Sequence, residues 1–292
     1  MYRNGTTEKP LGARINSHTI IFSLYGSHVL PRGGEIWIGS LIRAMAALDF
    51  SPGAVRALVS RMQRKGFLQS RRLGRRSFYE LTDWGLKNVR WGSERAFISP
   101  DDEWDGRWTV VTYSIPERHR KRRDALRAAL NSWGFGALVP GIWISPHQFT
   151  PRVEKKWREL GVWQYLEIFR AEHLGPSDPS NLVAQVWPQL SEIRDRYSAY
   201  IAQYEPILRR FEAGAICDEE CFAARLQCLF EFVAITLKDP ALPPSLLPQA
   251  WPRSSAQRLF QTLLKALAKP ANRFFDTIYK TGGETNDKDA PS

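Results

Sequence analysis

Apolar residues recur at helical spacing directly after Ser51. Four of them fall at i, i+3, i+4 and i+7, which places them on one side of a helix. They are Val55, Leu58, Val59 and Met62. Ser51 is a favourable N-cap, Pro52 fits the first helical position, and Gly66 fits the position after the helix ends. The pattern therefore predicts a capped amphipathic helix over residues 52–65.

Two segments with the character of strands follow this helix, residues 67–73 and 77–81, and Gly74 lies between them. Their pattern predicts a β-hairpin. The other elements expected here are helices over 20–29 and 40–48 with Ser17 and Ser40 as N-caps, a strand over 35–38, and a helix from Thr82 or Asp83 towards Phe97. This order is typical of a winged helix-turn-helix, which we expect to occupy residues 1–97.

The middle of the chain changes to a different pattern after a linker at 98–105, which contains Pro100 and is rich in acidic residues. The expected elements are a strand over 108–115, a helix over 118–132, a bent strand or hairpin over 136–145, a helix over 153–160 and a strand over 164–171. This is the order of the ferredoxin-like split βαβ fold. We therefore predict a ferredoxin-like α+β domain at 98–180.

Helical periodicity dominates from Asn181 onwards. Helices are expected over 190–211, 219–237 and 254–268, with a proline-rich segment at 239–252 between the second and the third. The polar residues 281–292 are expected to form a disordered tail. The predicted fold class is thus a multidomain α+β protein, in which residues 181–280 form a helical effector and dimerisation domain.

The distribution of charged residues along the chain indicates a function for the first predicted domain. Residues 1–95 hold 16 Lys and Arg against 6 Asp and Glu, which accounts for +10 of the net charge of +11. Eight of these cations lie between Arg56 and Arg76, a stretch without a single acidic residue. A basic module attached to an almost neutral remainder indicates a polyanionic partner, and the winged-helix pattern favours duplex DNA.

The expected DNA contacts follow from the helical register. The face opposite the apolar stripe carries small residues and arginines, and an arginine can bind a guanine edge or a phosphate with two parallel hydrogen bonds. The alternative is a solvated charged face, which most charged segments are. We predict that the helix contacts the major groove with Ser51, Arg56, Ser60, Arg61 and Arg64. The hairpin is expected to bind flanking phosphates or the minor groove with Arg71, Arg72, Arg75 and Arg76.

Several short motifs in a fixed order resemble the PaaX family of bacterial transcriptional repressors. They are GSLIR at 39–43, VR at 55–56, RRSFYELT at 75–82, WDGRW at 104–108, KDPALPP at 238–244, LLP at 246–248 and Trp251. The resemblance covers about residues 17–275. It implies a homodimeric repressor of an operon for aromatic-acid degradation, phenylacetate above all. It also implies release from double-stranded operator DNA by a CoA thioester such as phenylacetyl-CoA or a related aryl-CoA.

The sequence departs from the family pattern in one place. A sequence of the type His-Glu-Tyr-Arg is expected eight or nine residues before Asp239-Pro240, whereas this chain has Phe230, Glu231, Phe232 and Val233. The positions of the family's His and Arg are therefore apolar here. If those residues recognise the ligand in relatives, the ligand of this chain differs; they can equally be structural.

A second cluster of cations occupies the start of the helix expected at 118–132. It consists of Arg118, Arg120, Lys121, Arg122 and Arg123, with His119 among them. Cations at a helix N-terminus oppose the helix dipole, so the cluster is unusual for a solvated first turn. The functional alternative is a contact to the phosphates of CoA or to a DNA backbone. We predict an effector contact for Arg118, Arg120, Arg122 and Arg123.

Enzymatic alternatives have weaker support in the residues. The middle domain resembles the ferredoxin-like nuclease of CRISPR adaptation, but Ser114 stands where that nuclease carries a metal-binding Asp, and a hydroxyl does not replace a carboxylate on Mg²⁺. The acids of the linker could form a metal cluster, although a solvated linker or a helix cap is more usual for Asp101, Asp102, Glu103 and Asp105. Buried thiols are a better interpretation than a sensor or metal site for Cys217, Cys221 and Cys228.

We therefore expect no catalytic residues, no metal and no cofactor. The rival hypotheses are a metal-dependent nuclease or RNA-processing enzyme guided by its winged helix, and a DNA-bound adaptor whose C-terminal helices recruit protein. The sequence has no secretory signal pattern, and the apolar runs 19–24 and 229–237 are too short to span a bilayer. A cytoplasmic protein is expected.

Overall fold

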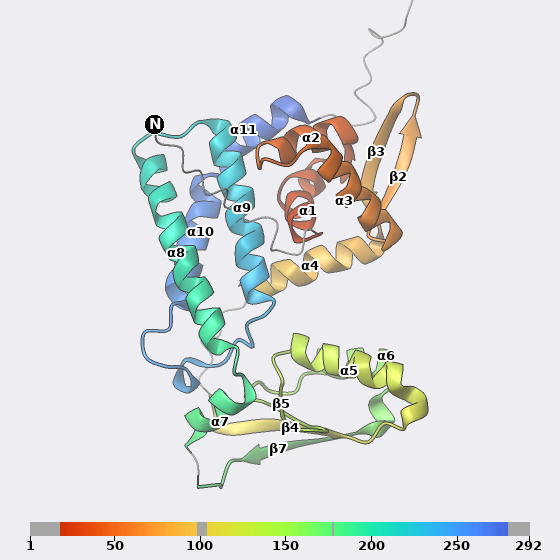
Figure 1. Ribbon diagram of the computed structural model, residues 1–292, viewed down its shortest axis with the longest axis vertical. Coiled ribbons are helices and arrows are strands. Elements are labelled where there is room, and N and C mark those ends of the chain that lie inside the picture. Colours follow the sequence, from red (N-terminus) through yellow and green to blue (C-terminus); the bar gives the residue numbers. More distant parts are fainter. Residues whose placement is uncertain (1–17, 98–103, 177, 280–292) are drawn as a thin grey trace, which may run out of the picture. The chain divides into compact units, whose positions relative to one another are not determined.

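The computed structural model describes residues 18–97, 104–176 and 178–279 (Figure 1). The chain divides into two compact units. The first contains Met1–Ala96, Tyr200–Ala234 and Ser255–Ser292, and the second contains Phe97–Ala199 and Ile235–Ser254. The C-terminal helices thus belong partly to one unit and partly to the other. Among the described residues, no helix is both long and apolar enough to cross a membrane.

The N-terminal part of the first unit is a winged helix, as predicted. Its elements are α1 (His18–Leu24), the π-helical turn η2 (Tyr25–Val29), the 3-10 turn η3 (Leu30–Arg32), β1 (Glu35–Trp37), α2 (Ile38–Ala46), α3 (Pro52–Arg64), β2 (Leu68–Leu73), β3 (Arg76–Leu81) and α4 (Asp83–Phe97). The three strands form an antiparallel sheet in the order β1-β3-β2. The β2–β3 hairpin is the wing and extends beyond the helices (Figure 1).

The two ends of α3 follow the chemistry that the sequence predicts. The amide of Ala54 donates to Oγ of Ser51 at 3.2 Å, so Ser51 is the N-cap. Gly66 has φ 72°, and the amide of Phe67 donates to the carbonyl of Met62 at 3.0 Å across it. This is the Schellman arrangement that favours glycine after a helix. Both ends of α3 are thereby determined by local sequence.

The expected cap at Ser40 is wrong. Helix α2 begins two residues earlier, at Ile38, and Trp37 is its N-cap in an extended conformation. Ser40 is buried in the first turn, and its hydroxyl has no hydrogen-bond partner among the described residues. The reason is that β1 passes directly into α2 without the loop that a serine cap would occupy. The other expected cap, Ser17, lies outside the described residues.

The C-terminal part of the chain forms four helices, α8 (Leu190–Glu212), α9 (Asp218–Thr236), α10 (Arg253–Ala266) and α11 (Ala268–Ile278). Two of them, α9 and α11, complete the core of the winged helix. One continuous apolar cluster includes residues of α1, α2 and α3 together with Phe222 and Phe275. At its edge, Arg32 binds Asp276 at 2.7 Å, and the hydroxyl of Tyr279 donates to the carbonyl of Glu35 at 2.8 Å. The winged helix is therefore part of a larger packed body.

His28 lies at the centre of this junction. Its ring is buried between those of Phe222 and Phe275, with centroids 5.1 and 5.0 Å away. One guanidinium nitrogen of Arg225, which is itself partly buried, approaches Nε2 at 3.3 Å. Burial, and then the charge of Arg225, lowers the pKa of His28 to about 3. The imidazole is therefore held neutral between the N-terminal and C-terminal parts of this unit.

Acid is expected to destabilise the first unit through His28. The unfolded chain protonates this histidine below its ordinary pKa of 6.5, whereas the folded chain does so only near 3. The free energy of unfolding should therefore fall as pH drops through this window, by at most about 1.4 kcal/mol per pH unit. The charged neighbours Arg32, Arg225 and Asp276 and the hydrogen-bonding Asn272 all face the ring.

Urea denaturation over a pH series, compared between the wild type and His28→Gln, measures this contribution. Burial raises the pKa of Glu231, so this carboxyl contributes a pH slope of opposite sign in both proteins. The difference between the two pH slopes therefore isolates the contribution of His28. A pH slope that is the same in both proteins would show that His28 plays no such part.

The second unit has the predicted ferredoxin-like order. It contains β4 (Arg107–Tyr113), the 3-10 turn η4 (Glu117–His119), α5 (Arg120–Ser132), β5 (Gly136–Val139), β6 (Ile142–Ser145), α6 (Pro151–Glu159), the 3-10 turn η5 (Trp163–Tyr165), β7 (Leu166–Glu172) and α7 (Pro179–Val186). The four strands are antiparallel in the order β5-β6-β4-β7, and the segment 136–145 is a hairpin. Helices α5 and α6 cover one face of the sheet around Trp157 (Figure 1).

A buried ion pair organises the proline-rich segment of this unit, which includes the 3-10 turn η6 (Pro244–Leu246). Arg253 binds Asp239 through two hydrogen bonds of 2.7 Å, and the two side chains are only 7% and 3% exposed. Arg253 also donates to the carbonyl of Leu242 at 2.9 Å. The carboxylate of Asp239 further accepts from the hydroxyl of Tyr197 and the amide of Ala241, each at 2.8 Å. Both charged side chains thus form several hydrogen bonds, which compensate for the removal of their charges from water.

Candidate nucleic-acid interface

Helix α3 presents two faces of different chemistry. Its buried side chains are those of Val55, Leu58, Val59 and Met62, as the periodicity predicts. The side chains expected to contact DNA are all exposed, namely those of Ser51, Arg56, Ser60, Arg61 and Arg64. The outward face therefore carries arginines separated by small side chains, without an acidic residue in the helix. Such a face can approach a groove closely and donate hydrogen bonds to bases or phosphates.

The wing places its four arginines in different settings. Arg72 and Arg75 are exposed, and Arg75 lies in the turn next to Gly74, which has φ 58°. Arg76 lies with its guanidinium 5.4 Å from the centre of the Trp37 ring. Arg72 and Arg75 are thus exposed on the hairpin, whereas Arg76, the first residue of β3 directly after the turn, lies near Trp37.

Arg71 is engaged within the protein. It binds Glu35 of β1 through two hydrogen bonds of 2.9 and 2.7 Å, and its guanidinium lies 5.8 Å from the centre of the Phe78 ring. The hydrogen bond to Glu35 raises the pKa of Arg71. This side chain thus links the outer strand of the wing to the strand at the opposite edge of the sheet. This link could not be predicted from local sequence patterns, because Glu35 and Arg71 are far apart along the chain.

The second basic cluster belongs to the start of the ferredoxin-like unit. Arg118 lies in a 3-10 turn, and the other three predicted effector contacts occupy the first turn of α5. Arg123 binds Glu117 at 2.8 Å, which lowers the pKa of Glu117, while the nearest carboxylate oxygen of Asp124 is 4.0 Å from Arg120. Arg122 is exposed. The four arginines are thus close together, and two of them have acidic neighbours within the protein.

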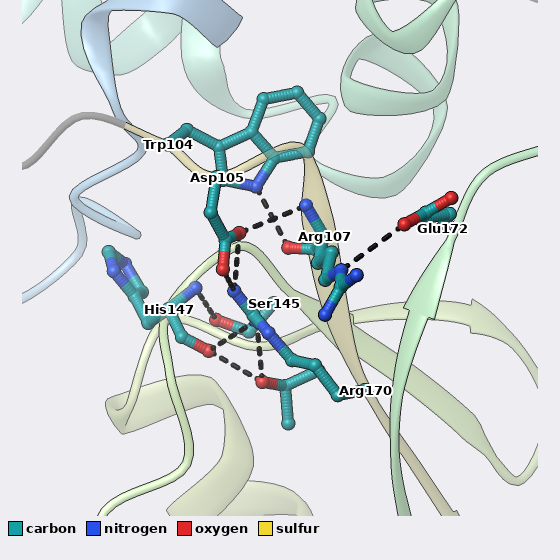
Figure 2. Close-up of polar contacts among 8 residues, drawn as sticks. Trp104, Asp105, Arg107, Ser145, His147, Arg170 and Glu172 are labelled. Atoms are coloured by element: carbon teal, nitrogen blue, oxygen red, sulfur yellow. Dashed lines mark hydrogen bonds and ion pairs between the residues drawn. The ribbon is translucent and has the colours of Figure 1, made fainter.

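Asp105, the last of the four linker acids, forms an ion pair within the middle domain. Figure 2 shows Arg170 of β7 bound to both carboxylate oxygens of Asp105, at 2.6 and 2.8 Å. The same guanidinium donates to the hydroxyl of Thr109 at 3.0 Å, and that hydroxyl donates to the carbonyl of His147 at 2.6 Å. Arg170 lowers the pKa of Asp105. Asp105 therefore fixes the start of β4 to the end of β7.

The residues that an enzymatic role would require are not gathered into a site among the described residues. Ser114 is exposed directly after β4, and the expected linker acids Asp101, Asp102 and Glu103 lie outside the described residues. Within the ranges that the structure describes, no group of three or more His, Cys, Asp or Glu side chains is arranged to hold a metal ion. Cys217 is exposed, whereas burial raises the pKa of Cys221 to about 11 and that of Cys228 to about 12.

Comparison with known proteins identifies the whole architecture. Three family models match successive parts of the chain: PaaX-like protein at residues 16–85, PaaX protein central Cas2-like domain at 101–183, and PaaX-like protein C-terminal domain at 187–277. The chain belongs to the PaaX family. It is 32% identical over 266 residues to the transcriptional repressor PaaX of Escherichia coli (strain K12). The matched region covers 89% of this chain and 83% of that protein.

A solved structure shares the fold of this PaaX-family chain. The uncharacterized protein Rv0674 from Mycobacterium tuberculosis matches with a TM-score of 0.52 and 23% identity, over 80% of this chain and 89% of the other. The three-domain α+β fold class is therefore confirmed, with an N-terminal PaaX domain, a central Cas2-like domain and a C-terminal helical domain.

The departure from the PaaX family pattern lies inside the first unit. Phe230 is buried in the cluster that joins α9 to the winged helix, and Val233 is buried on the same helix. Between them in sequence, Phe232 stacks on Phe260 of α10 with ring centres 4.2 Å apart. At these positions the chain has apolar side chains that pack within the fold. Glu231 is the exception, since its carboxylate accepts hydrogen bonds from Tyr204, Gln203 and Gln227.

Proposed function

We propose that this PaaX-family protein is a transcriptional repressor that binds a palindromic operator in duplex DNA as a homodimer in the cytoplasm. The observation that carries the proposal is the exposed face of α3, which is basic and free of acids, next to a basic wing. The Escherichia coli relative is named as a transcriptional repressor. In this proposal residues 1–97 bind DNA, 98–180 form the central domain, and 181–280 bind the effector and the second protomer.

Each part of the interface has its own task in this proposal. Helix α3 enters the major groove, where Arg56, Ser60, Arg61 and Arg64 contact bases or phosphates while Ser51 fixes the helix start. Arg72 and Arg75 bind flanking phosphates or the minor groove. Arg71 supports the wing through Glu35, and Arg76 acts from the start of β3, next to the turn of the hairpin.

The effector in this proposal is an aryl-CoA thioester such as phenylacetyl-CoA, and the controlled operon serves aromatic-acid degradation. Arg118, Arg120, Arg122 and Arg123 would bind the phosphates of CoA, which prefer clustered guanidinium groups. A thermal-shift comparison of free CoA, acetyl-CoA and a panel of aryl-CoA thioesters tests this part. Stabilisation by an aryl-CoA alone supports it, whereas no response to any thioester would contradict it and leave DNA binding unaffected.

Arg64→Ala is expected to weaken operator binding by about 1–3 kcal/mol and to relax the sequence preference, if Arg64 reads a guanine. Fluorescence anisotropy with the operator and with a random-sequence duplex measures both effects. Arg258→Ala on α10 is the matched control, because it removes the same charge from an exposed site in the same unit. An equal loss of affinity for the two duplexes would show that Arg64 contacts phosphate and reads no base.

A further inference from the structure

A partly buried arginine without an acidic partner lies where three segments of the first unit meet. Arg225 of α9 donates through Nε to the carbonyl of Leu264, near the end of α10, at 3.2 Å. One of its terminal nitrogens, Nη1, lies 3.3 Å from Nε2 of His28 in the turn η2. Both partners are uncharged, because burial holds the imidazole of His28 neutral. Within the ranges that the structure describes, Arg225 forms no ion pair.

Other arginines that join distant segments of this unit are bound to carboxylates. Arg32 binds Asp276 at 2.7 Å, and Arg273 binds Asp218 at 2.6 Å. Withdrawing a cation from water without a counter-ion is costly, and burial accordingly lowers the pKa of Arg225. The fold thus keeps one guanidinium partly withdrawn from water while its charge is not balanced by an acid.

The surroundings of Arg225 favour an anion. Glu231, the buried acid of the same helix, accepts hydrogen bonds from three uncharged side chains instead. Lys265 adds an exposed positive charge in the last turn of α10, directly after Leu264. The remaining guanidinium nitrogen of Arg225, Nη2, donates to no group among residues 18–97, 104–176 and 178–279, and part of the side chain is accessible to solvent. Guanidinium groups bind carboxylate and phosphate oxygens through short, charge-assisted hydrogen bonds.

We propose that Arg225 binds a carboxylate or phosphate group of a small molecule at the junction of η2, α9 and α10. The oxyanion accepts hydrogen bonds from Nη2 and supplies the negative charge that the fold does not provide. His28 reports its binding, because the positive charge of Arg225 opposes protonation of the imidazole. A bound anion therefore raises the pKa of His28 towards its ordinary value. The other charged groups that act on the ring, Arg32 and Asp276, are paired with each other.

Occupation of this site links anion binding to the stability of the winged helix. Phe222, one helical turn before Arg225 on α9, belongs to the apolar cluster that also contains residues of α1, α2 and α3. A ligand that binds the folded form alone stabilises it, and the effect grows with the ligand concentration. The site lies outside the predicted DNA contacts, so this inference goes beyond the proposed function and does not depend on it.

Thermal melts of the full-length protein test the site. Sodium phosphate and sodium acetate are titrated at pH 7 and constant ionic strength, with sodium chloride as the reference. We expect at least one of the two oxyanions to raise the Tm of the wild type by about 2–5 °C at ten times its Kd, and Arg225→Gln to lose this rise. Arg258→Gln, at an exposed site on α10, should respond like the wild type. A response to phosphate alone identifies a phosphoryl ligand, and a response to acetate alone identifies a carboxylate.

The imidazole of His28 provides a second, local readout. Its NMR resonance in the wild type, identified by its absence in His28→Gln, should shift when the stabilising anion is added. The ring should also become protonated at a higher pH than in chloride. This measurement needs no substitution of Arg225, so it decides the question even if Arg225→Gln does not fold.

Three results would overturn the site. Equal stabilisation of the wild type and Arg225→Gln would mean that the anion binds elsewhere. No rise in Tm with either anion would mean that neither group is bound. An unchanged His28 resonance at saturating phosphate and acetate would mean that no anion reaches Arg225. Operator binding enters none of these results, so a failure of the proposed DNA binding would leave the site standing.

Discussion

Phe275→Ala is expected to lower the free energy of unfolding of the first unit by about 3–5 kcal/mol. Phe275 is fully buried, and it packs against Phe222 of α9 and against His28 of the N-terminal turn. Removing it leaves a cavity where three segments that are distant in sequence meet. Because this cluster is continuous with the core beneath α3, DNA binding should be lost at a lower urea concentration than in the wild type.

The neighbouring residue provides the control for this experiment. Phe274 is only partly buried, although its ring lies 5.2 Å from that of Phe222, so Phe274→Ala should cost clearly less than Phe275→Ala. Urea denaturation followed by circular dichroism and by DNA binding measures both variants. Equal stability of the two variants would show that α11 is not an integral part of the winged-helix core.

Arg253→Met should destabilise the second unit by about 3–5 kcal/mol, because it leaves the carboxylate of Asp239 buried without its cation. The damage should be local at first, since this pair holds the proline-rich segment through the carbonyl of Leu242. Urea denaturation followed by circular dichroism reports the loss of stability. Replacing both partners, as in Arg253→Met with Asp239→Leu, should recover much of it.

Arg107→Met is the matched control for the buried pair. Arg107 binds Glu172 at 3.2 Å in the same unit, but both side chains are more than half exposed. Exposed ion pairs contribute little, because water and salt screen them, so the stability should barely change. Similar losses for Arg253→Met and Arg107→Met would mean that burial does not set the strength of the Asp239 pair.

Local patterns were sufficient for the parts of the fold that depend on neighbouring residues. The apolar stripe of α3, its cap at Ser51 and the glycine at 66 are written within sixteen residues, and the structure places each as predicted. The order of strands and helices in the central domain could also be predicted. The predicted N-cap at Ser40 was wrong. A serine before an apolar stripe is typical of an N-cap, but here the preceding strand passes directly into the helix.

Long-range packing could not be predicted in the same way. The stripe on α11 indicates that one face is buried, but periodicity does not say that Phe275 meets a histidine almost 250 positions earlier in the chain. The partnership of Glu35 with Arg71 and the stacking of Arg43 on Trp37 depend on strand register and on the start of α2. Arg71 and Arg43 thus have partners within the fold although both side chains are exposed.

Selection of DNA from a random-sequence library by the full-length protein tests the central claim most directly. The account predicts recovery of one duplex sequence with two-fold symmetry, bound by two protomers. It also predicts that Arg64→Ala selects a sequence with relaxed preference at one position in each half-site. No enrichment of any duplex sequence by the wild-type protein would contradict the account.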